Sequence, residues 1–436
     1  MIPRWLSGVS ERNGSLHISA HRRLVQNFFS LGALQALNYI LPLLTLPYLM
    51  RVLGANRFGL IAFAQSFVMY FNILTDYGFN LSATRQIAKY RKDRAKVNEV
   101  FTSVMIVKAG LLFVSLFVML TAVALVTKFR SEYFVYYAAF GIVIGQAMFP
   151  VWFFQGIERM GFITVINITA KLIFTGLVFL FIRKPSQYAY VPLVNSFGFI
   201  TAGALGLWIA SKSFGVRISR PSIKQLKDQL KDGWYIFLST VGVNIYKVDS
   251  TVILGLFASD ALVGYFYFAR RLVDAASQLA SIASQALYPF ISSKIDDGAM
   301  EIRKVLWVSV IILAGYGLIV GIGFILFAGP LTSVLTGHPY NETQLSLRIM
   351  AFVPLVIGLN VPAVLLLLGA KKDKAFSTVV VVGALLDLLL NLVLVPRFLY
   401  LGSCFSVVFT ETFITIGLYA VAVKNHLSKY LLAPAR

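Results

Sequence analysis

Basic side chains occur inside stretches of this sequence that are otherwise apolar enough to span a lipid bilayer. They are Lys108, Lys171, Lys247, Arg270, Arg271 and Arg348. A cation at the centre of a bilayer costs at least about 2.5 to 3.5 kcal/mol, so such residues face water, a paired group or a bound ligand. The chemistry that these residues favour is the binding of an anionic group inside the membrane.

Uncharged polar side chains accompany the cations at helical spacing. Residues three or four apart share one face of a helix, and several of the apolar stretches carry Asn, Gln or Thr at that spacing. The amides in these stripes are Gln35, Asn38, Asn72, Asn80, Asn167, Asn244 and Gln278. Because an unsatisfied polar group is costly in hydrocarbon, we expect these stripes to line a hydrated path.

Carboxylates lie in the same stretches. They are Asp76, Asp274, Asp387 and Glu411. Burial in apolar surroundings favours the protonated form of a carboxyl group, so a group of this kind can bind and release an ion during a transport cycle. We therefore predict that one of them couples transport to a proton or sodium gradient.

Architectural roles compete with these functional ones. Asp274 has the spacing of an ion pair within one helix with Arg270 or Arg271. Lys108 and Arg348 lie within two or three turns of a predicted helix end, from which a long side chain can snorkel to the membrane interface. A cavity role is favoured instead for the residues nearest mid-membrane, which are Lys171, Lys247, Asp387 and Glu411.

The composition excludes a soluble domain and gives no support to metal chemistry. Hydrophobic residues make up 58% of the 436 residues and charged residues 13%, whereas about a quarter of a soluble domain is charged. The mean hydropathy is +0.78. The single cysteine, Cys404, forms no intramolecular disulfide, and the four histidines show no ligand spacing, so we expect no metal site and no cofactor.

Twelve windows have about the 20 predominantly apolar residues that a spanning helix needs. They lie near residues 24–50, 59–82, 100–126, 133–154, 163–182, 188–210, 234–257, 263–290, 305–328, 344–368, 375–395 and 403–423. The predicted fold is an all-α polytopic membrane protein with twelve transmembrane helices.

The longest internal loop divides these helices into two sets of six. We predict an N-terminal tail at 1–23, a first lobe at 24–210, a basic linker at 211–233, a second lobe at 234–423 and a C-terminal tail at 424–436. The end of the linker, IKQLKDQLKDG, has apolar residues three and four apart among lysines. This pattern suits a short helix on the membrane surface, and it equally suits a solvated basic connector.

Lysine and arginine in the short loops set the predicted orientation. With the N-terminus inside, most of the basic residues outside the spans fall on the cytoplasmic side, as the positive-inside rule requires. Both termini are therefore predicted to be cytoplasmic. The net charge of +21 comes mostly from these cytoplasmic basic residues, which favour contact with anionic membrane lipids. Nucleic-acid binding is therefore not needed to explain the basic character of the chain.

One segment resembles a known family closely. The sequence LPLLTLPYLMRVLGANRFGLIAFAQSFVMYFNILTDYGFNLSATRQIAK, residues 41–89, resembles the first two helices of bacterial Wzx-type O-antigen and polysaccharide-repeat flippases. These proteins belong to the multidrug/oligosaccharidyl-lipid/polysaccharide exporter superfamily. The rest of the chain is compatible through its length, its twelve spans, its basic mid-chain loop and its VGYFYFARRL segment.

The resemblance implies a fold and a cargo. The fold would be two six-helix lobes around a central cavity that opens to one side of the membrane at a time. The cargo would be an oligosaccharide on undecaprenyl diphosphate, made at the cytoplasmic face of the bacterial inner membrane and passed to a polysaccharide polymerase. No catalysis is implied.

Specific roles follow as hypotheses. Lys171, Lys247, Arg270 and Arg271 would attract the diphosphate or acidic sugars, and the polar stripes would line the sugar path. A drug or organic-cation antiporter of the same superfamily is one alternative. A polytopic polysaccharide polymerase or membrane glycosyltransferase is another, although the longest outer loop, residues 329–343, has no pair of carboxylates for catalysis.

Overall fold

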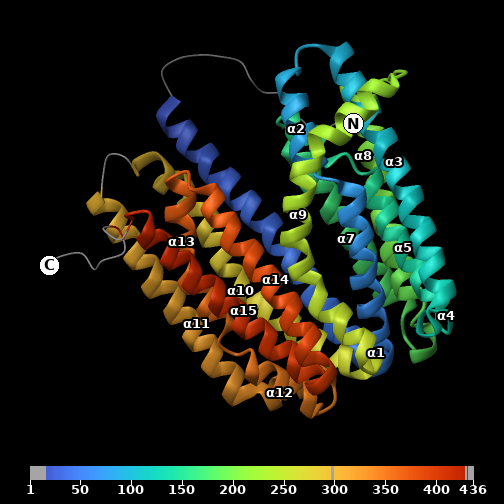
Figure 1. Cartoon of the computed structure of the whole chain (residues 1–436), viewed down its shortest axis with the longest axis vertical. Helices are drawn as coiled ribbons and strands as arrows, with labels where there is room; N and C mark the ends of the chain where they lie inside the picture. The colour runs from blue at the N-terminus through green and yellow to red at the C-terminus, as the bar shows by residue number, and fades with distance from the viewer. Residues whose placement is uncertain (1–15, 296–298, 428–429, 431–436) are drawn as a thin grey trace.

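The computed structural model describes the backbone of residues 16–295, 299–427 and 430. Side chains are described from residue 41 onward within these ranges, apart from 239–240, 242–249, 289, 293 and 299–300. All the regular elements in the described ranges are helices (Figure 1).

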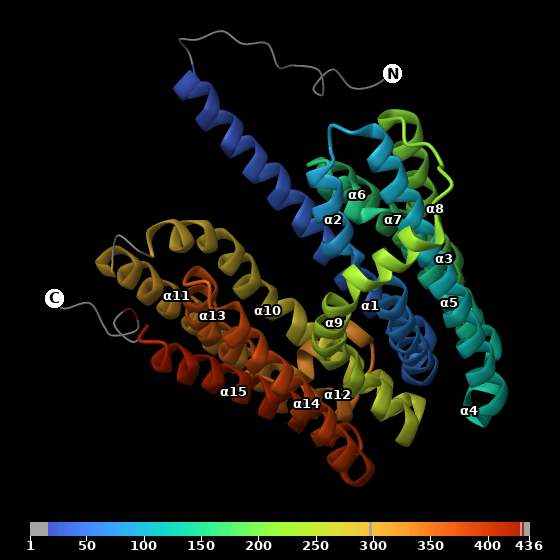
Figure 2. The same ribbon diagram turned by 45° about the horizontal axis from the view of Figure 1, so that its top comes forward.

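The helices fall into two groups along the chain. The first group contains α1 (Leu16–Asp76), α2 (Phe79–Lys89), α3 (Arg94–Leu125), α4 (Thr127–Arg130), α5 (Tyr133–Met148), α6 (Val151–Gly156), α7 (Met160–Phe181), the 3₁₀ turn η2 (Pro185–Gln187) and α8 (Tyr190–Phe214). The second contains α9 (Ile223–Phe257), α10 (Asp260–Lys294), α11 (Ala299–Thr336), α12 (Asn341–Ile349), α13 (Val353–Gly369), α14 (Asp373–Phe398) and α15 (Tyr400–Lys424). Figure 2 shows α2–α8 and α10–α15 as separate groups, with α1 and α9 between them.

A kink divides α1 into two arms. Gly54 has φ 73° and ψ 165°, a conformation that glycine adopts without the steric cost that a Cβ would bring. The first arm runs toward the end of the molecule that carries α4 and α12, and the second arm returns toward α2 (Figure 1). We call these the α4/α12 end and the α2 end. The two predicted windows at 24–50 and 59–82 lie on the two arms, the second one continuing into α2.

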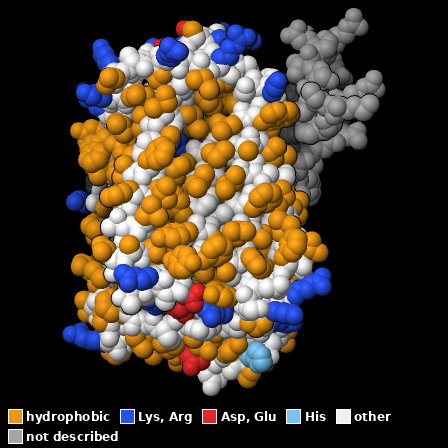
Figure 3. Space-filling model, turned by 90° about the vertical axis from the view of Figure 1, so that its right-hand side faces the viewer, with side chains coloured by type: hydrophobic (Ala, Val, Ile, Leu, Met, Phe, Trp, Pro, Cys, Tyr) orange, Lys and Arg blue, Asp and Glu red, His pale blue; other side chains and the backbone are white. Residues whose placement is uncertain are grey.

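Nine segments in the described ranges are long and apolar enough to cross a membrane. The first of them, Leu41–Lys89, contains part of both arms of α1, and α9 and α10 are not among the nine. Each of the twelve predicted windows overlaps a helix, and three of them, 59–82, 133–154 and 344–368, cross a short break between two helices, so the number of spans stays a prediction. An apolar belt covers the face shown in Figure 3, and Lys and Arg gather toward its two ends.

The two groups share a buried core at one end only. At the α4/α12 end, one cluster joins Phe63 of α1 and Tyr136 of α5 to Phe266 of α10. At the α2 end, Trp152 belongs to a cluster of the first group and Leu365 to another cluster of the second. The groups therefore hold together at the α4/α12 end and spread apart toward the α2 end (Figure 1).

Small residues let α1 and α10 approach closely at the α4/α12 end. A Cβ placed on Gly59 would lie 1.7 Å from the carbonyl oxygen of Asp260, and one on Gly264 would lie 2.4 Å from that of Ala55. Glycine at both positions allows backbone-to-backbone contact, as in other membrane helix pairs.

Two cations of the first group bind the C-terminal ends of helices in the second. Lys128 Nζ of α4 donates to the carbonyl oxygens of Gly255 at 2.5 Å and Ala258 at 3.0 Å, where α9 ends. Arg51 of α1 donates to the carbonyl oxygen of Leu335 at 2.8 Å and to that of its neighbour in α11. Positive charge at a helix C-terminus is favourable because the last carbonyl groups have no partner within the helix.

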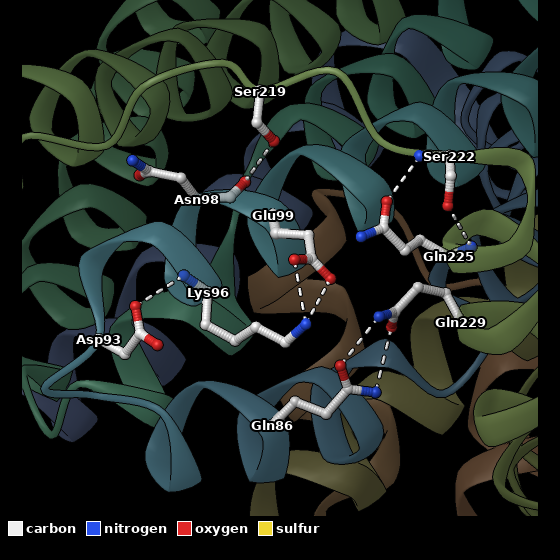
Figure 4. A network of polar contacts seen from close by, with 9 residues as sticks. All are labelled: Gln86, Asp93, Lys96, Asn98, Glu99, Ser219, Ser222, Gln225 and Gln229. Carbon is white, nitrogen blue, oxygen red and sulfur yellow. Dashed lines mark hydrogen bonds and ion pairs between the residues drawn. The ribbon is translucent and has the colours of Figure 1, made fainter.

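The linker predicted at 211–233 is only partly a connector. Ser222 and Gln225 form a reciprocal capping box, with distances of 2.6 and 3.3 Å, and from there α9 continues without a break to Phe257 (Figure 4). The expected separate surface helix is thus wrong, because Gly233 does not stop the helix but packs against Tyr77.

Polar contacts fasten the start of α9 to the first group. Gln229 of α9 exchanges two amide hydrogen bonds with Gln86 of α2, at 2.9 and 3.3 Å (Figure 4). Ser219 Oγ, in the connection before α9, donates to the carbonyl oxygen of Asn98 at 3.3 Å. The helix that opens the second half of the sequence is therefore tied to the first group at the α2 end.

Candidate functional site

Two neighbouring cavities lie mainly among the helices of the first group, with α9 of the second group at the wall of one and α10 at the wall of the other. One, about 480 Å³ in volume, is lined by three of the predicted amides, one predicted carboxylate and two further polar residues, and we call it the polar cavity: Asn72, Asn80, Asn167, Asp76, Lys108 and Gln146. The other, about 340 Å³, combines two cations and several amides with aliphatic side chains, and we call it the amphipathic cavity: Lys171, Arg271, Gln65, Asn167, Asn195, Leu46, Leu49 and Ile61. Both volumes are within the roughly 300–1,000 Å³ of small-molecule sites.

The polar cavity lies between the second arm of α1 and helices α3, α5 and α7. Asn80 Nδ2 donates to both carboxylate oxygens of Asp76, at 2.9 and 3.0 Å, across the break between α1 and α2. Asn72 Nδ2 donates to Gln146 Oε1 at 2.7 Å. These bonds fix the amides at the cavity wall. They do not use Gln146 Nε2 or Asn72 Oδ1.

Lys108 reaches this cavity from α3, which corrects the prediction that it snorkels to the interface. The residue is 3% exposed, and its Nζ lies 4.0 Å from Asp76 Oδ1. The helix position alone suggested a route to the interface, but the nearby carboxylate and the polar wall give the ammonium group a favourable environment inside the protein.

The amphipathic cavity receives its cations from α7 and α10. Lys171 lies on its wall, as does Arg271, whose Nη2 donates to the Tyr267 hydroxyl at 2.8 Å. The guanidinium carbon of Arg271 lies 4.7 Å from the centre of the Tyr267 ring, and its Nη1 is 3.8 Å from Asp274 Oδ2. The ring and the carboxylate hold this cation at the edge of an otherwise apolar wall.

The adjacent arginine has a different role. Arg270 Nε donates to Asp274 Oδ1 at 2.8 Å, and the two side chains form an ion pair within α10. The spacing therefore predicted the contact correctly. Of the two arginines, Arg271 lines the amphipathic cavity.

Asp387 lies in a buried polar network instead of a cavity wall. Its Oδ1 accepts hydrogen bonds from Ser406 Oγ at 2.6 Å and Thr410 Oγ1 at 3.0 Å, and its Oδ2 accepts one from Ser250 Oγ at 3.4 Å. Asn391 is also fully buried, and its Oδ1 has no hydrogen-bond partner among the described residues. The network joins α9, α14 and α15.

The remaining predicted residues are divided between the described and undescribed parts of the chain. Glu411 is buried on α15, and Gln278 is partly buried on α10. The side chains of the other four lie outside the described ones: Gln35, Asn38, Asn244 and Lys247. Within the described ranges, no three His, Cys, Asp or Glu side chains are grouped so that they could hold a metal ion.

Sequence reasoning missed two residues of the polar cavity. Lys108 was assigned to the interface, and Gln146 was not singled out. The available signal for Gln146 was its type, because it is the one carboxamide in the window 133–154. A third, surface cavity of about 440 Å³ lies between α2, α3 and α9, beside the contacts of Figure 4, and carries both signs of charge.

Two sequence comparisons match most of this chain to known proteins. A family model described as "Polysaccharide biosynthesis protein" matches residues 24–295. A protein of Escherichia coli (strain K12) that bears the name "Putative O-antigen transporter" is 30% identical over 408 residues, which cover 92% of this chain and 97% of that protein.

Solved structures share the fold at low sequence identity. The lipid II flippase MurJ in an inward closed conformation superposes with a TM-score of 0.68 and 14% identity, over 92% of this chain and 88% of MurJ. An inward-facing multidrug resistance transporter of the MATE family gives a TM-score of 0.62 and 16% identity, over 89% of this chain and 96% of the transporter. The prediction of an all-α, multi-pass membrane protein with the fold shared by MurJ and the MATE transporters is confirmed.

Proposed function

The chain belongs to the polysaccharide biosynthesis protein family, and from this premise we propose that it is a flippase for undecaprenyl-diphosphate-linked oligosaccharide repeat units. The observation that carries the proposal is a pair of adjoining cavities, one polar and one cationic, inside helices apolar enough to span a membrane. Sugar hydroxyls cannot cross hydrocarbon unaided, because each one loses its hydrogen bonds to water. A polar passage removes that barrier.

Family membership makes the protein a membrane transporter and not an enzyme. We propose that it works in the inner membrane of a bacterium, with twelve spans in two six-helix lobes and both termini in the cytoplasm. The α2 end would then face the cytoplasm, and the shared core at the α4/α12 end would close the periplasmic side. Separate cores at the α2 end support a state that is open inward.

The diphosphate would bind in the amphipathic cavity. Lys171 and Arg271 are the charged side chains among its described lining residues, so the cavity carries net positive charge. The aliphatic wall beside them suits the first isoprene units of the lipid carrier. Arg270 would act indirectly, by neutralising the Asp274 carboxylate that lies beside Arg271. We propose that Lys247 also attracts the diphosphate.

We also propose that ion movement drives transport. Asp76 and Asp387 are the carriers we favour, because Asp76 lines a cavity and Asp387 shares a buried network with Asn391, whose Oδ1 has no donor among the described residues. Asp274 and Glu411 remain candidates. Collapse of the proton and sodium gradients in membrane vesicles should stop transport, and unchanged transport would refute the coupling.

The transport proposal is tested by deleting the gene and locating the lipid-linked repeat units. We expect them to accumulate on the cytoplasmic side of the inner membrane with their synthesis intact, as measured with a periplasmic glycan-binding probe before and after permeabilisation. The double variant Lys171→Ala/Arg271→Ala should fail to restore export. Lys374→Ala, which removes an exposed cation in the first turn of α14, is the matched control and should restore it.

The proposal fails if repeat units reach the periplasm normally in the deletion strain. It also fails in its assignment of the cations if the double variant restores export at wild-type protein abundance.

A further inference from the structure

Lys108 is 3% exposed, and it lines the polar cavity. Its one described partner is Asp76, at 4.0 Å, and among the described residues it donates no hydrogen bond. Charge-assisted N–H···O hydrogen bonds are about 2.7–2.9 Å long, so Lys108 Nζ and Asp76 Oδ1 are too far apart for a direct hydrogen bond. Because Lys108 lines the cavity and donates no hydrogen bond to the described residues, its ammonium group is available to a ligand that enters the cavity and accepts hydrogen bonds.

The charge of the polar cavity restricts what that group can be. Among the described lining residues, Lys108 is the cation and Asp76 the anion, so their formal charges cancel. A diphosphate placed beside Lys108 would also meet the Asp76 carboxylate, and the attraction would be offset by repulsion. An uncharged, hydroxyl-rich group meets no such penalty, because Lys108 can donate to it and Asp76 can accept from it.

The amides strengthen this preference. Four carboxamides line the polar cavity: Asn72, Asn80, Gln146 and Asn167. Each carboxamide offers two donors and an acceptor, which suits the alternating donors and acceptors of a sugar ring. Asn72 and Asn80 are held by hydrogen bonds to Gln146 and Asp76, so the wall is ordered before a ligand arrives.

The amphipathic cavity has the opposite character and lies directly beside the polar one. Its described charged lining residues, Lys171 and Arg271, are both cations. Asn167 of α7 and Phe199 of α8 line both cavities, so one ligand can extend from one into the other.

We propose that the polar cavity is a sugar subsite in which Lys108 and the carboxamides bind an uncharged sugar ring, while the diphosphate of the same molecule lies in the amphipathic cavity. This inference rests on the proposed function and names the part of the substrate that each cavity takes. Lys108 is thereby a specificity residue for the glycan and not for the lipid diphosphate.

The test compares two ligands in lipid nanodiscs by native mass spectrometry. One is undecaprenyl diphosphate without sugar, and the other is the lipid-linked repeat unit extracted from the gene-deletion strain. The wild-type protein should bind the repeat unit more tightly than the bare diphosphate. In Lys108→Met the affinity for the repeat unit should fall roughly ten- to a hundredfold, the effect of one lost charged hydrogen bond, with little change for the bare diphosphate.

A second variant keeps the test independent of the charge pair. Gln146→Ala leaves Lys108 and Asp76 in place and should also weaken only the repeat unit. Lys171→Ala should weaken both ligands, because both carry the diphosphate. Thermal unfolding of each variant in the same nanodiscs verifies that it is folded.

The outcomes separate the two proposals. If the wild-type protein binds neither ligand, the proposed function is refuted. If it binds both, and Lys108→Met and Gln146→Ala weaken the two ligands equally or not at all, the function stands and the sugar subsite is refuted.

Discussion

The contact between α1 and α10 at Gly59 offers a direct test of how the α4/α12 end is closed. In Gly59→Ala the new Cβ would lie 1.7 Å from the carbonyl oxygen of Asp260 and 2.6 Å from the backbone nitrogen of Gly264. Both neighbours are backbone atoms, which cannot move aside as the tip of a side chain can. The whole helices must therefore separate.

The size of the effect follows from the geometry. Real Cβ contacts essentially never fall below 3.0 Å, so the helices must move apart by at least 3.0 − 1.7 = 1.3 Å at this point. Overpacking of this kind costs about 1–3 kcal/mol. If the cost is specific to the state in which the α4/α12 end is closed, the equilibrium shifts toward an open α4/α12 end by roughly 5- to 150-fold.

The measurement is a distance across the α4/α12 end. Spin labels at Ser131→Cys and Asn341→Cys, two exposed positions in different helix groups, report the separation by pulsed electron paramagnetic resonance. We expect Gly59→Ala to increase the population at long distance. Gly110→Ala is the control, because its Cβ would meet no atom within 4 Å and it gains the same helix propensity.

The reasoning would be refuted by a clear result. If Gly59→Ala and Gly110→Ala give the same distance distribution as the wild-type protein, close backbone contact between α1 and α10 does not hold this end shut.

Two further predictions concern polar contacts between helices. Lys128→Met removes the ammonium group that binds the end of α9, so a thiol reagent should reach the buried Cys404 of the shared core faster than in the wild-type protein. Arg130→Met on the same short helix should leave that rate unchanged, and equal rates for the two variants would contradict the proposed role. Ser406→Ala removes the 2.6 Å hydrogen bond to Asp387 and should lower the free energy of unfolding by about 1.5–3 kcal/mol in denaturant titrations. Thr378→Ala, an exposed hydroxyl bonded within its own helix, should change it by less than about 0.5 kcal/mol, and similar values for the two variants would count against the network.

The fold class could be predicted from the sequence because apolar length acts locally. A window of about 20 apolar residues forms a helix in a membrane whatever surrounds it, since backbone groups in hydrocarbon must bond within the segment. Every predicted window overlaps a helix for this reason, although the windows at 59–82, 133–154 and 344–368 each cross a short break between two helices. The linker was misjudged because continuity between two helices depends on packing, here that of Gly233 against Tyr77.

The candidate site was predicted only in part. Helical spacing correctly paired Arg270 with Asp274, because both lie on one helix. The same reasoning placed Asn72, Asp76, Asn80 and Asn167 among polar stripes, and the structure brings these four to one cavity. It failed for Lys108, since the groups that receive this side chain come from other helices.

The sequence by itself determined that this protein is a bundle of membrane helices with polar and charged residues inside it, because composition and period along the chain carry that information. Only the tertiary structure decided which of those residues meet. It separated a charge-balanced polar cavity from a cationic amphipathic one, and it placed Asp387 in a buried network. The physical reason is that a cavity wall is assembled from helices far apart in the chain, whose rotation and distance are set by packing, such as the contact of Gly59 with Gly264.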